Sequence, residues 1–442
     1  MKVRHLIVAM FLFATSYIYS SAQPEASSQV NPVTPIGLAV CLEEALSRNP
    51  SFASAAYSVD VARETLRGTT AAYRASVGLT LGTTKMGGPG VLGPDLSTYQ
   101  LAASATYPLY TNGEREAKLD GAKLGLQSSE YALDYARHQL ALSVTSAYFD
   151  LLKSDADVSS AEQRIRRTEA HLALVEARIV AETAPRSERA RALSDVESAR
   201  ASHAQALGTQ LSARATLNQL LARPVFDDIA VVRLLTPIYE SLHFKGYRAQ
   251  ARSNCPSLLE AQTQLDAYET NILAVKRQKG VTLSLGASQS ITDSTFPMDT
   301  DNRQWSMSLT ASYPLFDGDR IDSSLRSDKA TYNLQEENLR SLQMQVDLDV
   351  QLALTALKTA EAQLSAAEAF WAAAAEALGA ATRRYEAGFG NLVELIDAET
   401  AYYEAELQQN QTRYALFQAL ATLDWSIGKP LAIVDQVHME EN

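Results

Sequence analysis

The chain has 442 residues, enough to bury a large core, and its 51 Asp and Glu residues outnumber 39 Lys and Arg residues for a formal net charge of -12. A protein that binds nucleic acid usually presents a basic surface, so this balance argues against nucleic acid as a partner. Aromatic residues make up only 7% of the chain and alanine is abundant, which favours long, closely packed helices.

The N-terminus has the pattern of a secretory signal. A basic start precedes an apolar run from about Leu6 to Ala14, and small residues follow up to Ala22. We therefore expect residues 1–22 to be a signal peptide and residues 23–36, which are rich in proline, to be irregular. The alternative is a single membrane anchor, for which the apolar run is short. No later stretch has ~20 consecutive apolar residues, so no transmembrane helix is expected.

The sequence repeats itself after 206 residues. The segment YPLYTNGERE begins at Tyr107, and YPLFDGDRID begins at Tyr313. Self-similarity at so long a period indicates a duplicated half-structure and not a solenoid of short units. The predicted parts are a first repeat at 37–226, a connector at 227–242, a second repeat at 243–432 and a tail at 433–442.

Each repeat is predicted to contain a pair of strands. In WSMSLTASY, from Trp305 to Tyr313, apolar residues alternate with serine and threonine, and three other segments alternate in the same way. Strands of about ten residues with an apolar face and aromatic ends are typical of a membrane barrel with a polar lumen. A soluble sheet with one wet face would show the same alternation. The predicted strands lie near residues 77–86, 98–108, 280–289 and 303–314.

The repeated YPL motif lies where the second strand of each pair is expected to end. Proline cannot donate to the strand ladder and should stop it, the tyrosines suit a membrane interface, and the glycines turn the chain into the next element. An ordinary strand-to-helix turn could carry the same residues, but the duplication favours the special role. These residues are Tyr107, Pro108 and Gly113 in the first repeat and Tyr313, Pro314 and Gly318 in the second.

Two long helices are predicted, from about Gly113 to Glu182 and from about Asp319 to Ala387. Each stretch of ~70 residues would span about 100 Å. Apolar residues recur along both every seven residues, which predicts a heptad seam with a left-handed supercoil and not a cofactor-binding stripe. A second row on the later helix consists of Ala353, Ala360, Ala367, Ala374 and Ala381. Shorter helices are predicted at about Leu42–Tyr73, Ser187–Ala222, Leu258–Gln278 and Asn391–Ile427.

No motif in the sequence indicates catalysis, a metal site or a cofactor. The six histidines are scattered without the spacing of metal ligands, and GFG, from Gly388 to Gly390, is too short for a dinucleotide loop. Cys41 and Cys255 could pair in an oxidising compartment. They do not occupy equivalent positions in the repeat, so two isolated thiols are favoured.

Four strands cannot close a membrane barrel, because open edges are not tolerated in lipid and the smallest natural barrels have about eight strands. The protein is therefore expected to oligomerise. The chain resembles the TolC-like outer-membrane efflux protein family in GLAVCLEEALSRNPSFASA, in both YPL strand ends, and in RRYEAGFGNLVELIDAETAYYEAE with its GKPL. The resemblance covers essentially the whole mature length.

The resemblance implies a mainly α protein with a membrane β-barrel portion. A duplicated helix–strand–strand–long helix–helix unit would form a homotrimer with a 12-stranded β-barrel, continued by a coiled-coil α-helical barrel. The implied function is the passive exit duct of a tripartite efflux pump or type I secretion system, in the outer membrane of a Gram-negative-type cell. Its implied partners are outer-membrane lipid, a periplasmic adaptor and an inner-membrane pump or ABC exporter. The alternative is a periplasmic coiled-coil scaffold without a pore, which would be soluble without detergent.

The resemblance also assigns roles to the second helical tip, YEAGFGNLVELIDAE. Gly388 falls on the turn glycine of the family, and Gly390 stands where well-known members carry a latch arginine. Together with Asn391 and Leu392, these glycines form the expected adaptor contact. The implied periplasmic aperture consists of Tyr385, which helps to hold it shut, and the acids Glu188, Glu394 and Asp397.

The first tip departs further from the family. Glu182 stands at the position of the turn glycine and Pro185 lies within the turn, although Glu188 still supplies an acid at the matching place. The acids of the second tip also have a second interpretation. Asn391 and Glu394 have the spacing of a helix-capping pair, and acids in a first turn suit the helix dipole. The spacing alone does not separate capping from a lumenal ring.

Overall fold

The structure is a computed structural model, and it describes residues 35–87, 96–233 and 244–429. The predicted signal peptide at 1–22 and tail at 433–442 lie outside the described residues, as do most of the 23–36 segment and part of the 227–242 connector. The described elements belong to a unit that begins at Pro35.

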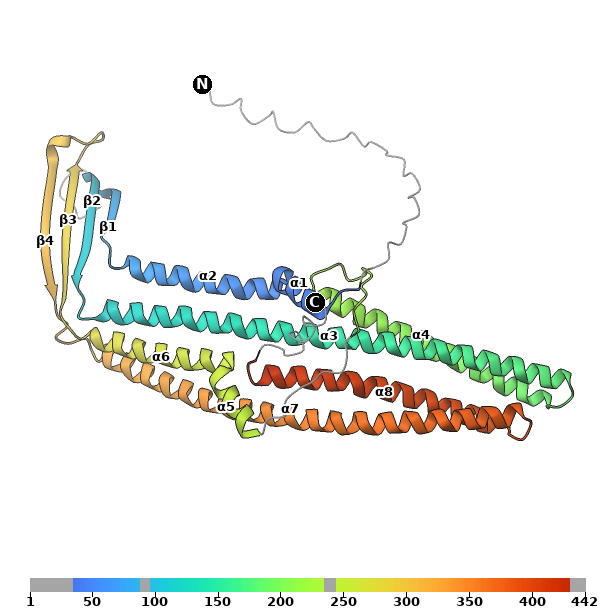
Figure 1. The fold of residues 1–442 in the computed structure, drawn as a ribbon. Coiled ribbons are helices and arrows are strands. Elements are labelled where there is room, and N and C mark those ends of the chain that lie inside the picture. Colours follow the sequence, from blue (N-terminus) through green and yellow to red (C-terminus); the bar gives the residue numbers. More distant parts are fainter. Residues whose placement is uncertain (1–34, 88–95, 234–243, 430–442) are drawn as a thin grey trace, which may run out of the picture. The chain divides into compact units, whose positions relative to one another are not determined.

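The elements follow the same order twice (Figure 1). The first set is α1 (Leu38–Arg48), α2 (Pro50–Ala71), β1 (Ser76–Met86), β2 (Leu96–Tyr110), α3 (Glu114–Val180) and α4 (Arg186–Leu220). The second set is α5 (Phe244–Asn254), α6 (Pro256–Arg277), β3 (Thr282–Asp293), a 3-10 turn (Thr300–Asn302), β4 (Arg303–Ser312), α7 (Arg320–Glu386) and α8 (Leu392–Ser426). Matching helices have equal lengths, with 67 residues in α3 and α7 and 35 in α4 and α8. The mainly α, duplicated unit is confirmed.

The single helix predicted for about residues 42–73 is wrong, because the chain breaks at Asn49. Pro50 has no backbone N–H and disfavours helical backbone in the residue before it, so Asn49 is extended with φ -67° and ψ 123°. The Asn49 side chain then accepts hydrogen bonds from backbone N–H groups in the first turn of α2 and caps that helix. The same break occurs at Cys255 before Pro256, where α5, which the sequence did not predict, ends.

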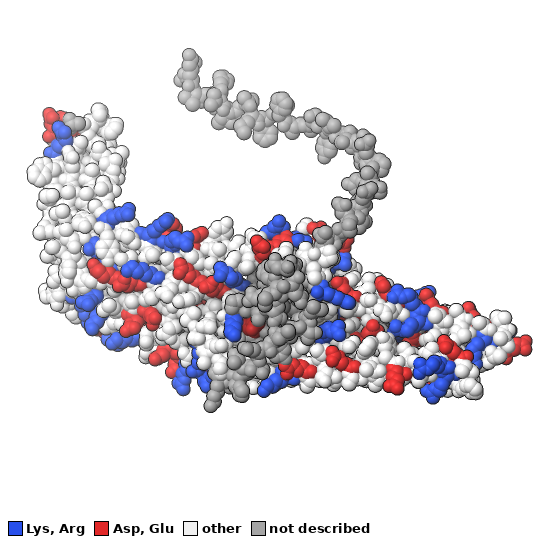
Figure 2. Space-filling model, in the orientation of Figure 1, with Lys and Arg blue, Asp and Glu red and all other residues white. Residues whose placement is uncertain are grey.

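The four strands form one antiparallel sheet in the order β1-β2-β3-β4. The register places Leu81, Leu101 and Ile291 side by side, and it places Leu285 opposite Leu309, so the apolar residues of all four strands share one face. The other face carries small polar residues. Figure 2 shows the sheet almost entirely white, with charged residues where loops join its strands.

The expectation that Pro108 ends its strand is wrong, because β2 continues to Tyr110. The first strand, β1, begins at Ser76, opposite Thr106, so at Pro108 the strand β2 has a neighbour only on the β3 side. An edge position tolerates the missing N–H of proline, and a register shift follows Pro108. In the second repeat β4 ends at Ser312, before Pro314 and one residue short of the predicted end at Tyr313.

The chain turns into each long helix through left-handed backbone at the two glycines of the YPL motifs. Gly113 has φ 83° and Gly318 has φ 67°, values that glycine adopts without steric cost. Asn112, beside the first of these glycines, is also left-handed, and its side-chain amide donates to the carbonyl of Arg277 at 2.8 Å. This bond ties the start of the α3 segment to the end of α6, across the two repeats.

The predicted heptad seam is buried or half-buried along both long helices and serves packing. Val144 and Leu151 on α3 and Val350 on α7 are 1% exposed or less. The second row on α7 is buried throughout, with exposures of 7% or less at Ala353, Ala360, Ala367, Ala374 and Ala381. Small residues in a seam let neighbouring helices approach closely.

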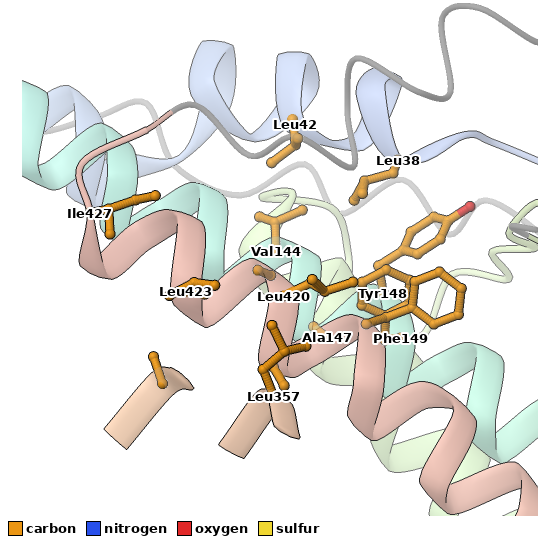
Figure 3. Close-up of a cluster of buried hydrophobic side chains, with 14 of the residues drawn as sticks. Leu38, Leu42, Val144, Ala147, Tyr148, Phe149, Leu357, Leu420, Leu423 and Ile427 are labelled. Carbon is orange, nitrogen blue, oxygen red and sulfur yellow. The ribbon is translucent and has the colours of Figure 1, made fainter. Parts of the chain in front are cut away.

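A larger buried cluster joins the two repeats where α1, α3, α7 and α8 meet (Figure 3). Leu38 from α1, Tyr148 from α3 and Leu420 from α8 point into this cluster. The Tyr148 hydroxyl donates to the carbonyl of Val232 at 2.6 Å and fastens the segment after α4. Helix α3 also packs against α6, so α3 and the β2–β3 pairing join the two repeats. Within the described ranges, no helix combines the length and apolar character needed to span a membrane.

Candidate functional site

The two helical tips, where α3 turns into α4 and α7 turns into α8, share one backbone path (Figure 1). The turns place Glu182 and Gly388 in the left-handed region, with φ 58° and 79°. In each turn the backbone N–H of the left-handed residue donates to the carbonyl three residues earlier in the chain. The N–H of the next residue donates to the carbonyl five residues before it. This is a common helix-ending motif. The glutamate at 182 therefore preserves the turn at a cost of about 1 kcal/mol relative to glycine.

The side chains of both tips pack into a single apolar cluster. It consists of Val175, Ala192, Ala381, Tyr385, Leu392 and Leu395, each 3% exposed or less. These residues come from all four tip helices, so the two tips hold each other in place. Leu392, one of the expected adaptor contacts, is 2% exposed, and in this conformation its side chain is not available to a partner.

Tyr385 of the second tip makes its polar side-chain contacts with residues of the first tip. Its hydroxyl donates to Glu188 Oε2 at 3.1 Å. The guanidinium of Arg178 lies 4.6 Å from the centre of its ring and donates to its backbone carbonyl at 3.1 Å. Burial, and then the bond to Glu188, raises the pKa of Tyr385, so the hydroxyl keeps its proton. The structure thus brings together two predicted aperture residues and adds Arg178, which the sequence analysis missed.

The two acids of the second tip are not equivalent. The Glu394 side chain forms an ion pair with Arg384. Its backbone N–H donates a hydrogen bond to Asn391 Oδ1 at 2.8 Å. Half of the capping arrangement is therefore present, because Asn391 caps α8 while the carboxylate of Glu394 turns to Arg384. Asp397 is exposed and has no hydrogen-bond or ion-pair partner among the described residues.

Position 390 requires glycine because the turn passes very close to the backbone at the end of α7. A Cβ atom there would lie 2.9 Å from the backbone nitrogen of Tyr385 and 3.1 Å from the carbonyl carbon of Arg384. Any side chain would push the turn away from the end of α7. An arginine at this position could not act as a latch without moving the turn, so contacts elsewhere must hold the tips together. The contacts of Arg178 and Glu188 with Tyr385 fill that role.

A cluster of buried charges lies on α3, α4 and α8 beyond the apolar tip cluster. Glu399 is fully buried, with His171 Nδ1 at 2.9 Å and Arg167 Nε at 3.4 Å. Arg164 is 6% exposed and pairs with Asp195 at 3.3 Å, and burial, followed by the charge of Glu399, raises the pKa of Asp195. The matching positions of the other repeat are apolar: Leu193, Ala377, Ala373, Phe370 and Ala401.

The remaining predicted residues lie at the opposite ends of α3 and α7, where β2 and β4 join the long helices. Tyr107 and Tyr313 are 40% and 57% exposed, and their place at a membrane interface stays a prediction. Cys41 and Cys255 are separate buried thiols, as favoured, and burial raises the pKa of Cys41 to about 12. Nowhere in the described ranges do three His, Cys, Asp or Glu side chains converge as metal ligands would.

The chain is similar to known outer-membrane proteins. The sequence model of a family described as outer membrane efflux protein matches residues 41–223 and 248–429. OprJ of Pseudomonas aeruginosa is 26% identical over 353 residues, which cover 76% of this chain and 72% of OprJ. OpmQ, a pyoverdine export outer membrane protein of Pseudomonas putida, is 23% identical over 333 residues, or 75% and 71% of the two chains. A crystal structure of CusC has the same fold, with a TM-score of 0.79 at 19% identity over 90% of this chain and 93% of that one.

Proposed function

The chain belongs to the outer membrane efflux protein family, and we propose that its two helical tips form the periplasmic gate of the channel. As a member of this family it is an outer-membrane exit channel of an efflux or secretion system, with a helical extension in the periplasm. Members of the family are transport channels. The main support for this gate is a pair of hydrogen bonds between the tips. Arg178 and Glu188 of the first tip both bond to Tyr385 of the second.

The sheet and α7 support assembly as a homotrimer. β1 and β4 lie at the two ends of the strand order, and joining β4 of one copy to β1 of the next in three copies would close a barrel of about twelve strands. The shared apolar face would then contact outer-membrane lipid, and the polar face would line the lumen. Helix α7 also leaves apolar side chains between 48% and 60% exposed, which a second copy would cover: Leu334, Met344, Leu348 and Leu352.

The gate acids would form a ring in the trimer. Glu394 and Asp397 are three residues apart on α8 and share a face, so three copies would bring about six carboxylates together at the narrow end. A ring of acids focuses negative potential and favours cations. Because Arg384 neutralises part of the charge of Glu394, Asp397 should contribute more to this potential.

The turn of the second tip suits contact with a periplasmic adaptor, which would connect the channel to an inner-membrane pump or ABC exporter. Gly388 and Gly390 have no side chains and let a partner approach the backbone closely, and Asn391 is exposed beside them. Leu392 supports this surface from within, since it packs in the tip cluster. The first tip offers Glu182 and Pro185 in place of the glycine and asparagine, so the two tips would present different surfaces.

Reconstitution tests the proposal. The purified protein should be a trimer in detergent, and it should form ion-conducting pores in planar bilayers. Opening the tips, by replacing Glu188 with glutamine, should raise the conductance, because the Tyr385 hydroxyl loses its charged acceptor. A protein that stays soluble and monodisperse without detergent, and that carries no current, would be a scaffold and not a channel.

A further inference from the structure

The two tips contain the same pair of charged residues and use it differently. Arg178 and Glu188 in the first tip match Arg384 and Glu394 in the second, and in each pair the arginine precedes the glutamate by ten residues. In the second tip Arg384 and Glu394 form an ion pair with each other. In the first tip, by contrast, no ion pair joins Arg178 and Glu188 among the described residues, and both instead contact Tyr385.

Tyr385 is what separates the first pair. Its ring lies against the Arg178 guanidinium, and its hydroxyl donates to Glu188. The matching residue in the first repeat is Ile179, which has no hydroxyl, so an isoleucine cannot make the equivalent bond to Glu394. Arg189, the neighbour of Glu188, is already paired with Glu176 at 2.9 Å.

We propose that the first tip is a two-state latch in which Tyr385 acts as a removable wedge. With the wedge in place, Arg178 and Glu188 both hold Tyr385 and the two tips are locked together. When Tyr385 withdraws, Arg178 pairs with Glu188, as Arg384 already pairs with Glu394. An ion pair between the same two residues thus takes the place of their bonds to Tyr385, and neither charge is left without a partner.

This exchange of partners would allow a binding partner to open the gate. An element with two packed states of similar free energy can be shifted by a ligand that prefers one of them. A partner that binds the turn only after Tyr385 has withdrawn would therefore open the gate. The latch rests on the proposed gate function, but the exchange of partners can be observed without any transport.

The exchange can be tested by measuring current through planar bilayers for the full-length protein. The measurement compares the effect of Arg178→Gln in the parent with its effect in the Tyr385→Ala protein. Tyr385→Ala removes the wedge and should raise the mean current about tenfold, since it takes a cation–π interaction and a charge-assisted hydrogen bond away from the closed state. Adding Arg178→Gln to Tyr385→Ala should change the current little, because without the tyrosine ring Arg178 can pair with Glu188 in both states. In the parent, Arg178→Gln should raise the current, because there Arg178 holds the wedge.

The matched control is Arg384→Gln, since its ion pair with Glu394 is present in both states. It should change the current by the same factor with and without Tyr385→Ala. A current that rises as much when Arg178→Gln is added to Tyr385→Ala as when it is made in the parent would overturn the latch. A structure of the Tyr385→Ala protein provides a second test, because Arg178 and Glu188 should then lie within about 4 Å. If the parent carries no current, the gate fails, while this structure still decides the exchange.

Discussion

The two repeats have the same order of main helices and strands, with long helices of equal length, and have specialised largely through their side chains. The tips show this most clearly, since both turns make the same two helix-ending hydrogen bonds although one has Glu182 and the other Gly388 at the left-handed position. The contacts around the turns differ, because only the second tip has a tyrosine for the first to hold. Backbone bonds thus preserve the fold after duplication, while single residues are free to take up new roles.

The same contrast appears where the helices pack beside the tips. Arg164, Arg167 and His171 on α3 lie against Glu399 of α8 and Asp195 of α4, whereas the matching position of each in the other repeat carries an apolar residue. A buried charge cluster contributes little net stability but is costly to break. We therefore expect the cluster to favour one alignment of α3 and α8.

Breaking this cluster should have the largest effect. Glu399→Gln removes the buried negative charge that faces His171 and Arg167 and should lower the free energy of unfolding by about 3–5 kcal/mol. Converting the site to the residues of the other repeat, with Glu399→Leu, His171→Ala and Arg167→Ala together, should recover most of that loss. Thermal unfolding of the detergent-solubilised protein measures both. Equal destabilisation by the single and triple variants would show that the charges act as a stabilising unit and not as an alignment device.

The sheet offers the next comparison, because the register places apolar residues of both repeats on one face. Leu309→Lys in β4 and Leu101→Lys in β2 should each cost roughly 2–4 kcal/mol near the bilayer midplane. Ser308→Lys should cost less, since this residue belongs to the opposite, polar face. Folding yield into lipid vesicles measures the difference. Equal damage at positions 308 and 309 would show that the assigned faces are wrong.

The sequence predicted the parts of the fold that depend on local pattern. The repeat, the strand faces and the alanine row on α7 all follow from spacing, because periodicity reports directly which side of an element is buried. The strand through Pro108 could not be predicted, since it depends on where β1 begins opposite β2. The hydrogen bond from Arg178 to Tyr385 joins residues 207 positions apart in the sequence, and no local pattern indicates it. A signal for it did exist, however, in the arginine that recurs at 178 and 384.

Exchanging the turn residues of the tips tests how far the shared backbone extends. Glu182→Gly should stabilise the protein by about 1 kcal/mol, because glycine adopts the left-handed backbone without strain, and Gly388→Ala should destabilise it by a similar amount. Gly390→Ala should also destabilise, by about 1–3 kcal/mol, since its Cβ would collide with the end of α7. The control is Ala184→Gly at the matching position of the first tip, where thermal unfolding should change by less than about 1 kcal/mol.

The smallest effect on stability, and the most specific effect on transport, is expected for the acids of the second tip. Glu394→Ala with Asp397→Ala should weaken cation selectivity and block by multivalent cations in planar bilayers, because the negative potential of the ring is lost. Stability should fall by no more than about 1 kcal/mol, since the Glu394 pair with Arg384 is largely exposed and Asn391 still caps α8. The single variant Asp397→Ala should account for more of the change in selectivity than Glu394→Ala, whose carboxylate is already paired. Asn391→Ala is the control for capping, and it should cost about 1 kcal/mol while leaving selectivity intact. If the double variant conducts and is blocked like the parent, the two acids serve only the start of the helix, and the selectivity of the channel must arise elsewhere along its length.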